Sequence, residues 1–325
     1  MKEILIEFLI LFLSGVALVF GADLVIKAVT SFAKKLGASE YFVGFMVVAI
    51  GTSAPELINA LVASLSALRI NDLFFKNSLG NIVLGNLIGA NILDSLFVFG
   101  IMAFVAKKLF VEDEVINRST FLMLILIVLP LILSLDGYLS KFDGLILIFA
   151  FLFYVKDLWD KEVSLGKLEK DVSLRKLVHE FLIFGIGIPI LIISSKYFVI
   201  SAVKIADFLN IPAFIIGLTI VSLGTTLPEL SVGIISSYKG HKNIGFGNIL
   251  GSVMFNILFI LGVASLINPI SVDINSFLVS FMFMICGVYI AILFLDKKTI
   301  TWREGLGLLV LYITFLVVQL KGIFI

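Results

Sequence analysis

Two nearly identical stretches, one in each half of the chain, constrain the fold most. Residues 44–57 read GFMVVAIGTSAPEL, and residues 217–230 read GLTIVSLGTTLPEL. Each places a glycine, two hydroxyls, a proline and a glutamate in an otherwise apolar run of membrane-spanning length. A second pair follows at 85–100 (GNLIGANILDSLFVFG) and 247–262 (GNILGSVMFNILFILG). The duplication predicts two structural repeats around a polar functional centre.

The composition places these repeats in a lipid bilayer. Hydrophobic residues make up 60% of the 325 positions and charged residues 14%, a balance that soluble domains rarely show. Apolar windows recur along the whole chain, which predicts an all-α polytopic membrane protein. The net charge of +1 gives no indication of a nucleic-acid partner. Ten transmembrane helices are expected near 4–33, 40–68, 79–105, 117–135, 141–157, 178–208, 212–238, 245–267, 274–295 and 304–322.

The distribution of Lys and Arg predicts the orientation in the membrane. If the charged segment at 156–176 is cytoplasmic, most other basic residues fall on that side too. They are Lys34, Lys35, Lys107, Lys108, Arg118, Lys239, Lys242, Lys297, Lys298 and Arg303. Both termini are therefore expected outside, in a multi-pass protein of the cell membrane. Glu7 interrupts the first apolar run, which favours a span over a signal peptide.

The number of spans in each half determines how the halves are related. Five is an odd number, so the second repeat at 178–325 enters the membrane from the opposite side to the first at 1–157. The sequence therefore predicts two inverted-topology five-helix repeats, with broken helices at the midplane and a substrate site between them. The linker at 158–177 is too short for a folded domain.

The first motif is expected to break its helix. Pro55 has no backbone donor, and Gly51 loosens the turn before it. Backbone carbonyl groups near Ala49 and Thr52 should become available as a result. Unwound backbone at membrane depth is tolerated only where protein or a cavity surrounds it.

The two motifs together offer a set of oxygen ligands. The set comprises Ala49, Thr52, Ser53 and Glu56 in the first half and Ser222, Thr225, Thr226 and Glu229 in the second. Hard cations such as Ca²⁺ and Na⁺ prefer oxygen, whereas zinc prefers nitrogen and sulfur. The chain has two histidines, His179 and His241, and both lie at predicted cytoplasmic helix ends.

Buried carboxylates need a reason to be there. A charge at the bilayer centre costs about 2.5–3.5 kcal/mol on insertion scales. If Glu56, Glu229 and Asp94 converge to about 5 Å, each pair repels by about 3 kcal/mol at an effective dielectric of 20. They must bind cations, bind protons or stay apart. Asn256 occupies the position in the second half that matches Asp94. The glycines of both GNxxG stretches are explained equally well by close helix packing as by a role in ion binding.

The doubled G-T-[ST]-x-P-E motif, followed by G-N-x-x-G-x-x-x-x-[DN], resembles the α-repeats of the cation/calcium exchanger superfamily, and prokaryotic sodium/calcium exchangers in particular. The resemblance implies a Ca²⁺/Na⁺ antiporter with Glu56 and Glu229 as shared ligands, completed for Ca²⁺ by the Thr52 and Thr225 carbonyls. Flanking Na⁺ sites would use the Ala49 and Ser222 carbonyls and the hydroxyls of Ser53, Thr226 and Ser252. Asp94 and Asn256 would face each other, and the first and sixth helices would slide against the other eight. No enzyme activity, cofactor or protein partner is implied.

Three departures from the family pattern keep a second hypothesis open. Ala90 stands where a serine is usual, the Asp and Asn are exchanged between the halves, and Thr226 replaces a serine. The lost hydroxyl at Ala90 leaves open a Ca²⁺/H⁺ antiporter that uses the same carboxylates as proton carriers. An intramembrane aspartyl protease is disfavoured, because Asp23 and Asp94 lie in no recognisable G-x-G-D context. A cation channel would more naturally use rings of side chains in an oligomer.

Overall fold

The computed structural model shows a protein built from helices, as the hydropathy predicts. The structure describes residues 2–69, 73–106, 108–110, 113–164, 166, 177–208, 222–272, 274–296 and 299–324. The first half contains α1 (Lys2–Leu36), α2 (Glu40–Val43), η1 (Gly44–Val48), α3 (Ala49–Thr52), α4 (Ala54–Leu68), α5 (Leu73–Ile92), η2 (Leu93–Val98), α6 (Phe99–Ala106), α7 (Asp113–Leu126), α8 (Leu129–Leu133) and α9 (Lys141–Ser164). The second half contains α10 (Val178–Phe208), α12 (Ser222–Thr225), α13 (Leu227–Tyr238), α14 (Lys242–Met254), η5 (Phe255–Ile260), α15 (Leu261–Ile267), α16 (Ile274–Asp296) and α17 (Trp302–Phe324).

Six of these helical segments are long and apolar enough to cross a membrane, and a seventh candidate is a bent pair. The pair joins Glu40–Thr52 to Ala54–Leu68 at an angle of 46°. Much of the span expected at 212–238 lies outside the described residues, which resume at Ser222. The remaining expected spans overlap helices of the structure, with boundaries that differ by a few residues.

The bend confirms the break predicted from Pro55. Ser53 leaves helical geometry at φ −83° and ψ 11°, and Pro55 stands in the first turn of α4, where its missing N–H is tolerated. Because Pro55 has no N–H, the carbonyl of Gly51, four residues earlier, lacks the donor that a continuous helix would supply. The Ala49 carbonyl, in contrast, accepts a hydrogen bond from the Ser53 N–H at 3.0 Å.

The second half repeats this break. Thr226 separates α12 from α13 at φ −93° and ψ 2°, and Pro228 stands in the first turn of α13. By position in the repeat, 217–221 corresponds to the π-helical η1, but those residues lie outside the described part of the chain.

Two further π-helical segments were not expected from the sequence. The segments η2 and η5 occupy matching places after α5 and α14. Asp94 is the second residue of η2, and Asn256 is the second residue of η5. A π turn widens a helix by one residue, and such turns are often found at functional sites.

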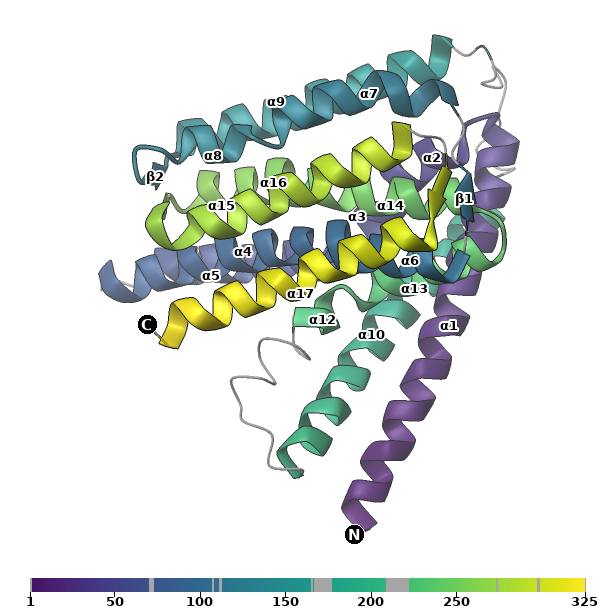
Figure 1. The fold of residues 1–325 in the computed structure, drawn as a ribbon, viewed down its shortest axis with the longest axis horizontal. Helices are drawn as coiled ribbons and strands as arrows, with labels where there is room; N and C mark the ends of the chain where they lie inside the picture. Colours follow the sequence, from purple (N-terminus) through teal and green to yellow (C-terminus); the bar gives the residue numbers. More distant parts are fainter. Residues whose placement is uncertain are drawn as a thin grey trace.

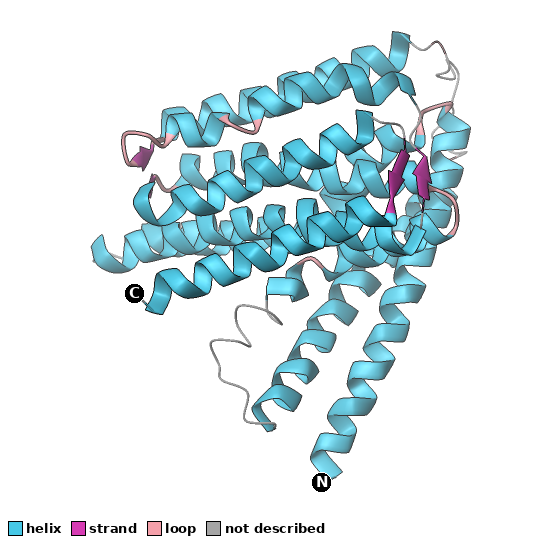
Figure 2. Ribbon diagram, in the orientation of Figure 1, coloured by secondary structure: helices cyan, strands magenta, loops and turns pink. Residues whose placement is uncertain are grey.

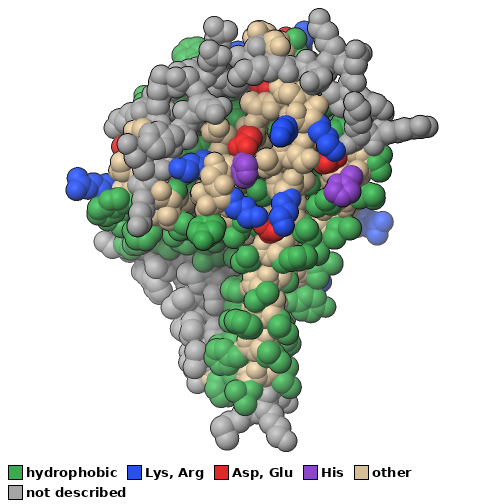
Figure 3. All heavy atoms as spheres, turned by 90° about the vertical axis from the view of Figure 1, so that its right-hand side faces the viewer, with side chains coloured by type: hydrophobic (Ala, Val, Ile, Leu, Met, Phe, Trp, Pro, Cys, Tyr) green, Lys and Arg blue, Asp and Glu red, His purple; other side chains and the backbone are tan. Residues whose placement is uncertain are grey.

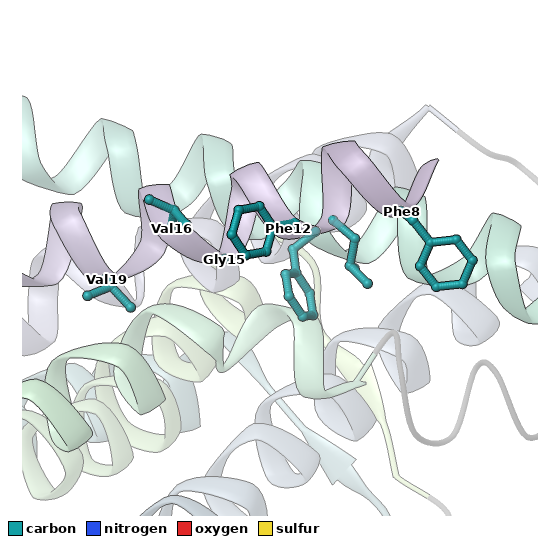
Figure 4. Close-up of a pocket in the computed structure, with 7 residues that line it drawn as sticks. Phe8, Phe12, Gly15, Val16 and Val19 are labelled. Atoms are coloured by element: carbon teal, nitrogen blue, oxygen red, sulfur yellow. The ribbon is translucent and has the colours of Figure 1, made fainter. Parts of the chain in front are cut away.

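The long helices α1 and α10 form a pair that is inclined steeply to the other helices (Figure 1). Helices of this length are expected either to tilt strongly in a bilayer or to extend beyond it. Their contact is close, since a Cβ on Gly187 would meet Val25 Cγ2 at 2.9 Å. An apolar groove of about 560 Å³ runs along α1 and is lined by Phe8, Phe12 and Val16 among others (Figure 4). Such a surface suits contact with lipid chains.

The bundle carries two small antiparallel sheets that the all-α expectation missed (Figure 2). Strand β1 (Lys108–Phe110) pairs with β4 (Thr299–Thr301), and β2 (Tyr138–Leu139) pairs with β3 (Ile270–Ser271). The strands are two or three residues long and join connections from the two halves of the chain. The labelled strands β1 and β2 lie at opposite ends of the bundle (Figure 1).

Charged side chains gather at the end of the bundle where β1 and β4 lie (Figure 3). Ion pairs there join Lys35 to Glu180 at 2.6 Å and Lys239 to Asp23, while His241 contacts Glu40 at 2.7 Å. Both histidines of the chain are visible on this face. It is the face that the distribution of basic residues predicts to be cytoplasmic.

Candidate cation site

The two motif glutamates are buried together at the centre of the bundle. Glu56 is 1% exposed and Glu229 is 2% exposed. Each lies in the first turn of the helix after its break, α4 for Glu56 and α13 for Glu229. The two carboxylates are close enough to interact electrostatically. The helix N-termini favour negative charge there and offset part of the cost of burying it.

Hydroxyl groups from each motif reach the carboxylate of the other motif. The Ser53 hydroxyl donates to Glu229 Oε1 at 3.4 Å, and Thr52 also contacts Glu229. Thr225 makes the equivalent hydrogen bond to Glu56. The exchange of partners follows the sequence duplication and ties the two broken helices together. Ser222 begins α12, next to the undescribed residues that precede it.

Other predicted residues are buried around this pair. The Thr52 hydroxyl donates to Asn248 Oδ1 at 3.0 Å, and the Thr226 hydroxyl donates to the Leu223 carbonyl at 3.0 Å. Ser252, in α14, is fully buried. Ala49 is buried as well, and its carbonyl accepts a hydrogen bond from the Ser53 N–H.

Asp94 and Asn256 are both 1% exposed, and Asp94 is close enough to both glutamates to interact with them electrostatically. Asn256 Nδ2 donates to Asn91 Oδ1 at 2.9 Å, and Asn91 Nδ2 donates to the Val253 carbonyl at 3.2 Å. Asn91 was not among the residues predicted from the sequence. Its counterpart in the second half is Val253, so comparing the two repeats does not identify Asn91 as a polar site residue. The sequence feature that could have identified it is an amide side chain within an apolar run.

Several buried oxygen atoms of the site have no hydrogen-bond partner among the described residues. They are Glu56 Oε2, Glu229 Oε2, Asp94 Oδ1, Asn256 Oδ1 and Ser252 Oγ. Buried polar atoms in proteins are nearly always paired, so each such atom needs an explanation. Bound cations offer one, because each cation accepts lone pairs from several oxygen atoms.

The donor set also limits which cations fit. Carboxylate, hydroxyl and amide oxygens suit hard ions such as Ca²⁺ and Na⁺. Within the described ranges, no three His, Cys, Asp or Glu side chains form a group able to hold a metal. A bound ion would therefore use neutral oxygens as well as carboxylates.

A cavity of about 490 Å³ adjoins the site. Its wall includes Pro55, next to Glu56, and Thr225, whose hydroxyl reaches the Glu56 carboxylate. The remaining walls come from α10, from the first turns of α4 and from Gly224 of α12. The cavity therefore lies between α10, α12 and the start of α4, the helix that carries Glu56.

Comparison with known proteins identifies a family and several relatives. The family described as sodium/calcium exchanger protein matches residues 6–156 and 179–321. The sodium/calcium exchanger MaX1 of Methanosarcina acetivorans is 30% identical, over 97% of this chain and 99% of its own length. The inner membrane protein YrbG of Escherichia coli is 33% identical over 78% of each chain. A solved structure of the sodium-calcium exchanger NCX_Mj, soaked with Na⁺ and Sr²⁺, superposes with a TM-score of 0.81 at 25% identity, over 97% of this chain and 98% of that one.

Proposed function

The chain belongs to the sodium/calcium exchanger protein family, and on that premise we propose that it exchanges Ca²⁺ for Na⁺ across the cell membrane by alternating access. It is a multi-pass membrane protein, and its relatives are transporters rather than enzymes. One observation carries the proposal. Two carboxylates from duplicated broken helices are buried side by side, among oxygen atoms that no described protein group satisfies.

In this proposal, the same carboxylates hold either Ca²⁺ or Na⁺. Glu56 and Glu229 bind Ca²⁺ together with the Thr52 and Thr225 carbonyls. Na⁺ uses flanking positions formed by Ser53, Thr226, Ser252 and the Ala49 and Ser222 carbonyls, with Asp94 and Asn256 between them. An occupied site carries less net charge than an empty one, so it crosses between the two access states more readily. A Na⁺ gradient then drives Ca²⁺ in the opposite direction.

The inverted architecture is part of the same proposal. Paired strands must lie on the same side of a membrane, so an even number of crossings must separate β1 from β4 and β2 from β3. Ten crossings in two inverted repeats meet this condition, with six crossings between the first pair and four between the second. We propose the repeat boundaries at 1–157 and 178–325, with both termini outside as the distribution of basic residues predicts.

Calcium flux under defined gradients tests the exchange. Vesicles containing the protein should accumulate ⁴⁵Ca²⁺ when an outward Na⁺ gradient is imposed at constant pH. An outward proton gradient at fixed Na⁺ should drive no comparable uptake. Flux that follows only the proton gradient would contradict sodium coupling.

Ala90 favours the second candidate, a Ca²⁺/H⁺ antiporter. Ala90 is buried in α5, and its counterpart Ser252 offers a hydroxyl that has no partner among the described residues. A flanking Na⁺ position on the Ala90 side therefore lacks one oxygen. The Ala90→Ser variant should bind Na⁺ more tightly, seen as inhibition of ⁴⁵Ca²⁺ uptake at lower Na⁺ concentration. Unchanged Na⁺ inhibition would argue that no Na⁺ binds next to Ala90.

A further inference from the structure

The cavity beside the cation site contains one charged side chain among its described lining residues, Lys196 of α10. Lys196 is exposed, and none of the described carboxylates forms an ion pair with it. The other polar lining groups are Ser195, Asn59 and Thr225, and the Ser195 hydroxyl donates to the Gly224 carbonyl at 2.5 Å. A positive charge thus stands in a space that adjoins the cation ligands.

The lining residues indicate which side of the membrane this cavity serves. Lys196 and Ile200 lie in the C-terminal half of α10, which begins at the charged face near Glu180. Pro55 and Asn59 lie in the first turns of α4, which runs away from that face. The cavity is therefore on the side that the basic residues predict to be outer.

The matching position in the first repeat carries the opposite charge. Asp23 occupies the place in α1 that Lys196 occupies in α10. Asp23 forms ion pairs with Lys27 at 2.8 Å and with Lys239, on the charged side of the bundle. Inverted repeats would give the two access paths similar walls, but these residues make them electrostatically unequal.

We propose that Lys196 is a specificity-determining residue of the outer access path, which disfavours the entry of a divalent cation relative to a monovalent one. This inference rests on the proposed exchange of Ca²⁺ for Na⁺. The local concentration of an ion depends exponentially on the product of its charge and the local electrostatic potential. A lysine that lowers local Na⁺ roughly two-fold at low ionic strength therefore lowers Ca²⁺ roughly four-fold, the square of that factor. Outer Na⁺ then competes better against outer Ca²⁺, which favours Na⁺ uptake from this side.

Right-side-out vesicles test the proposal through two measured constants. These are the half-saturating outer Ca²⁺ concentration for ⁴⁵Ca²⁺ uptake and the outer Na⁺ concentration that halves this uptake when outer Ca²⁺ is kept far below half-saturation. In Lys196→Gln, the first should fall roughly four-fold and the second roughly two-fold, and Lys196→Glu should square both factors. Lys196→Arg keeps the charge and should behave like the wild type. Added inert salt should reduce every shift, because it screens the charge.

Two controls separate a local charge effect from other causes. Lys141→Gln removes a lysine at the start of α9, on the same predicted side but outside the cavity, and should shift neither constant. Inside-out vesicles of Lys196→Gln should keep the wild-type half-saturating Ca²⁺ concentration, since Lys196 does not face the inner path. Three results would overturn the proposal. The Na⁺ and Ca²⁺ constants of Lys196→Gln could change by the same factor, neither constant could change, or the Ca²⁺ constant could change in inside-out vesicles.

The gradient dependence of Ca²⁺ flux in the wild-type protein tests the proposed function separately from the role of Lys196. If its Ca²⁺ flux follows only a proton gradient, sodium coupling fails, and the Lys196 comparison is then made between Ca²⁺ and the monovalent proton. The ratio between the two cation factors still decides the role of Lys196.

Discussion

Glu56 and Glu229 dominate the chemistry at the residue scale, because two buried carboxylates this close repel each other unless a positive charge compensates them. Removing either charge should relieve the repulsion and remove a ligand at the same time. The folded protein should therefore survive the change better than the transport activity does.

We predict that Glu56→Gln and Glu229→Gln abolish ⁴⁵Ca²⁺ exchange and leave the cation-free protein at least as stable as the wild type. Ca²⁺ at about 100 times its dissociation constant should stabilise the wild type by about 2.7 kcal/mol and the variants by almost nothing. Thermal unfolding in detergent with and without Ca²⁺ measures this difference. Glu162→Gln is the control, because Glu162 is equally buried but binds Ser39 away from the site. Wild-type flux in either site variant would remove that glutamate from the ligands.

The residues of the site differ in how far the sequence could predict them. Glu56 and Glu229 stood out, since a duplicated carboxylate in an apolar run has few structural explanations. Asp94 and Asn256 were marked by their matching positions. Asn91 was not, because its hydrogen bonds to Asn256 and to the Val253 carbonyl depend on packing between the halves.

At the scale of elements, the close contact between η1 and α14 holds one broken helix in place. A Cβ on Gly251 would meet Ala49 Cβ at 2.6 Å and the Phe45 carbonyl oxygen at 2.8 Å. Real Cβ atoms do not approach other atoms that closely, so a side chain there must push the two segments apart. Ala49 and Thr52 belong to the same broken helix, and the displacement would reach the site.

We predict that Gly251→Ala lowers both the melting temperature and the rate of Ca²⁺ exchange. The loss of stability should be about 1–3 kcal/mol, the usual range for overpacking a dense core. Gly307→Ala is the matched control, since Gly307 is exposed on α17 and an added Cβ would meet no described atom within 4 Å. That variant should be neutral or slightly stabilising, because alanine favours helices. A neutral Gly251→Ala would mean that η1 and α14 can move apart at no cost in stability.

The ion pairs that join α1 to other parts of the described chain divide into two kinds. Lys35 binds Glu180 and Lys204 binds Glu7, and both pairs join α1 to α10. Lys239 binds Asp23, and this pair joins α1 to the residue that follows α13, the helix that carries Glu229. If α1 and α10 move together against the other helices, the first two pairs persist and the third must break.

We predict that Lys239→Gln shifts the protein toward opening at the charged face, whereas Lys35→Gln does not. Ile200 lines the outer cavity and reports its opening. A cysteine at Ile200, in a Cys286→Ser background, should react more slowly with a polar maleimide in Lys239→Gln. Its rate in Lys35→Gln should match the parent. Equal slowing in both variants would show that the two kinds of ion pair respond alike.

Breaks in the helices were predictable, but their exact form was not. Proline and glycine in the sequence predict a break in the helix, and the structure has a bend after Thr52. The π-helical η2 and η5 have no proline or glycine within them, so their wider turns depend on packing. The strands β1 to β4 are too short to leave an alternating pattern.

At the scale of the whole molecule, hydropathy predicted the helical membrane fold and most helix positions. The inverted orientation of the two halves was predicted from the number of spans in each half. That count is sensitive to one weak element. Among the described residues between β1 and β2, the apolar helical stretch is Thr120–Leu133, and it is shorter than an ordinary span. If α7 and α8 did not cross while α16 did, five crossings would separate β1 from β4, and these two strands could not pair.

We therefore predict that the two sheets face opposite sides of the membrane. The Cys286→Ser protein has no cysteine, so single cysteines at Tyr138 in β2 and Thr299 in β4 can each be labelled with a membrane-impermeant maleimide. In right-side-out vesicles, the cysteine at Tyr138 should react and the one at Thr299 should react only after the membrane is made permeable. Inside-out vesicles should reverse this order. The same side for both positions would make the number of crossings between β1 and β2 even, and five spans per repeat would then be wrong.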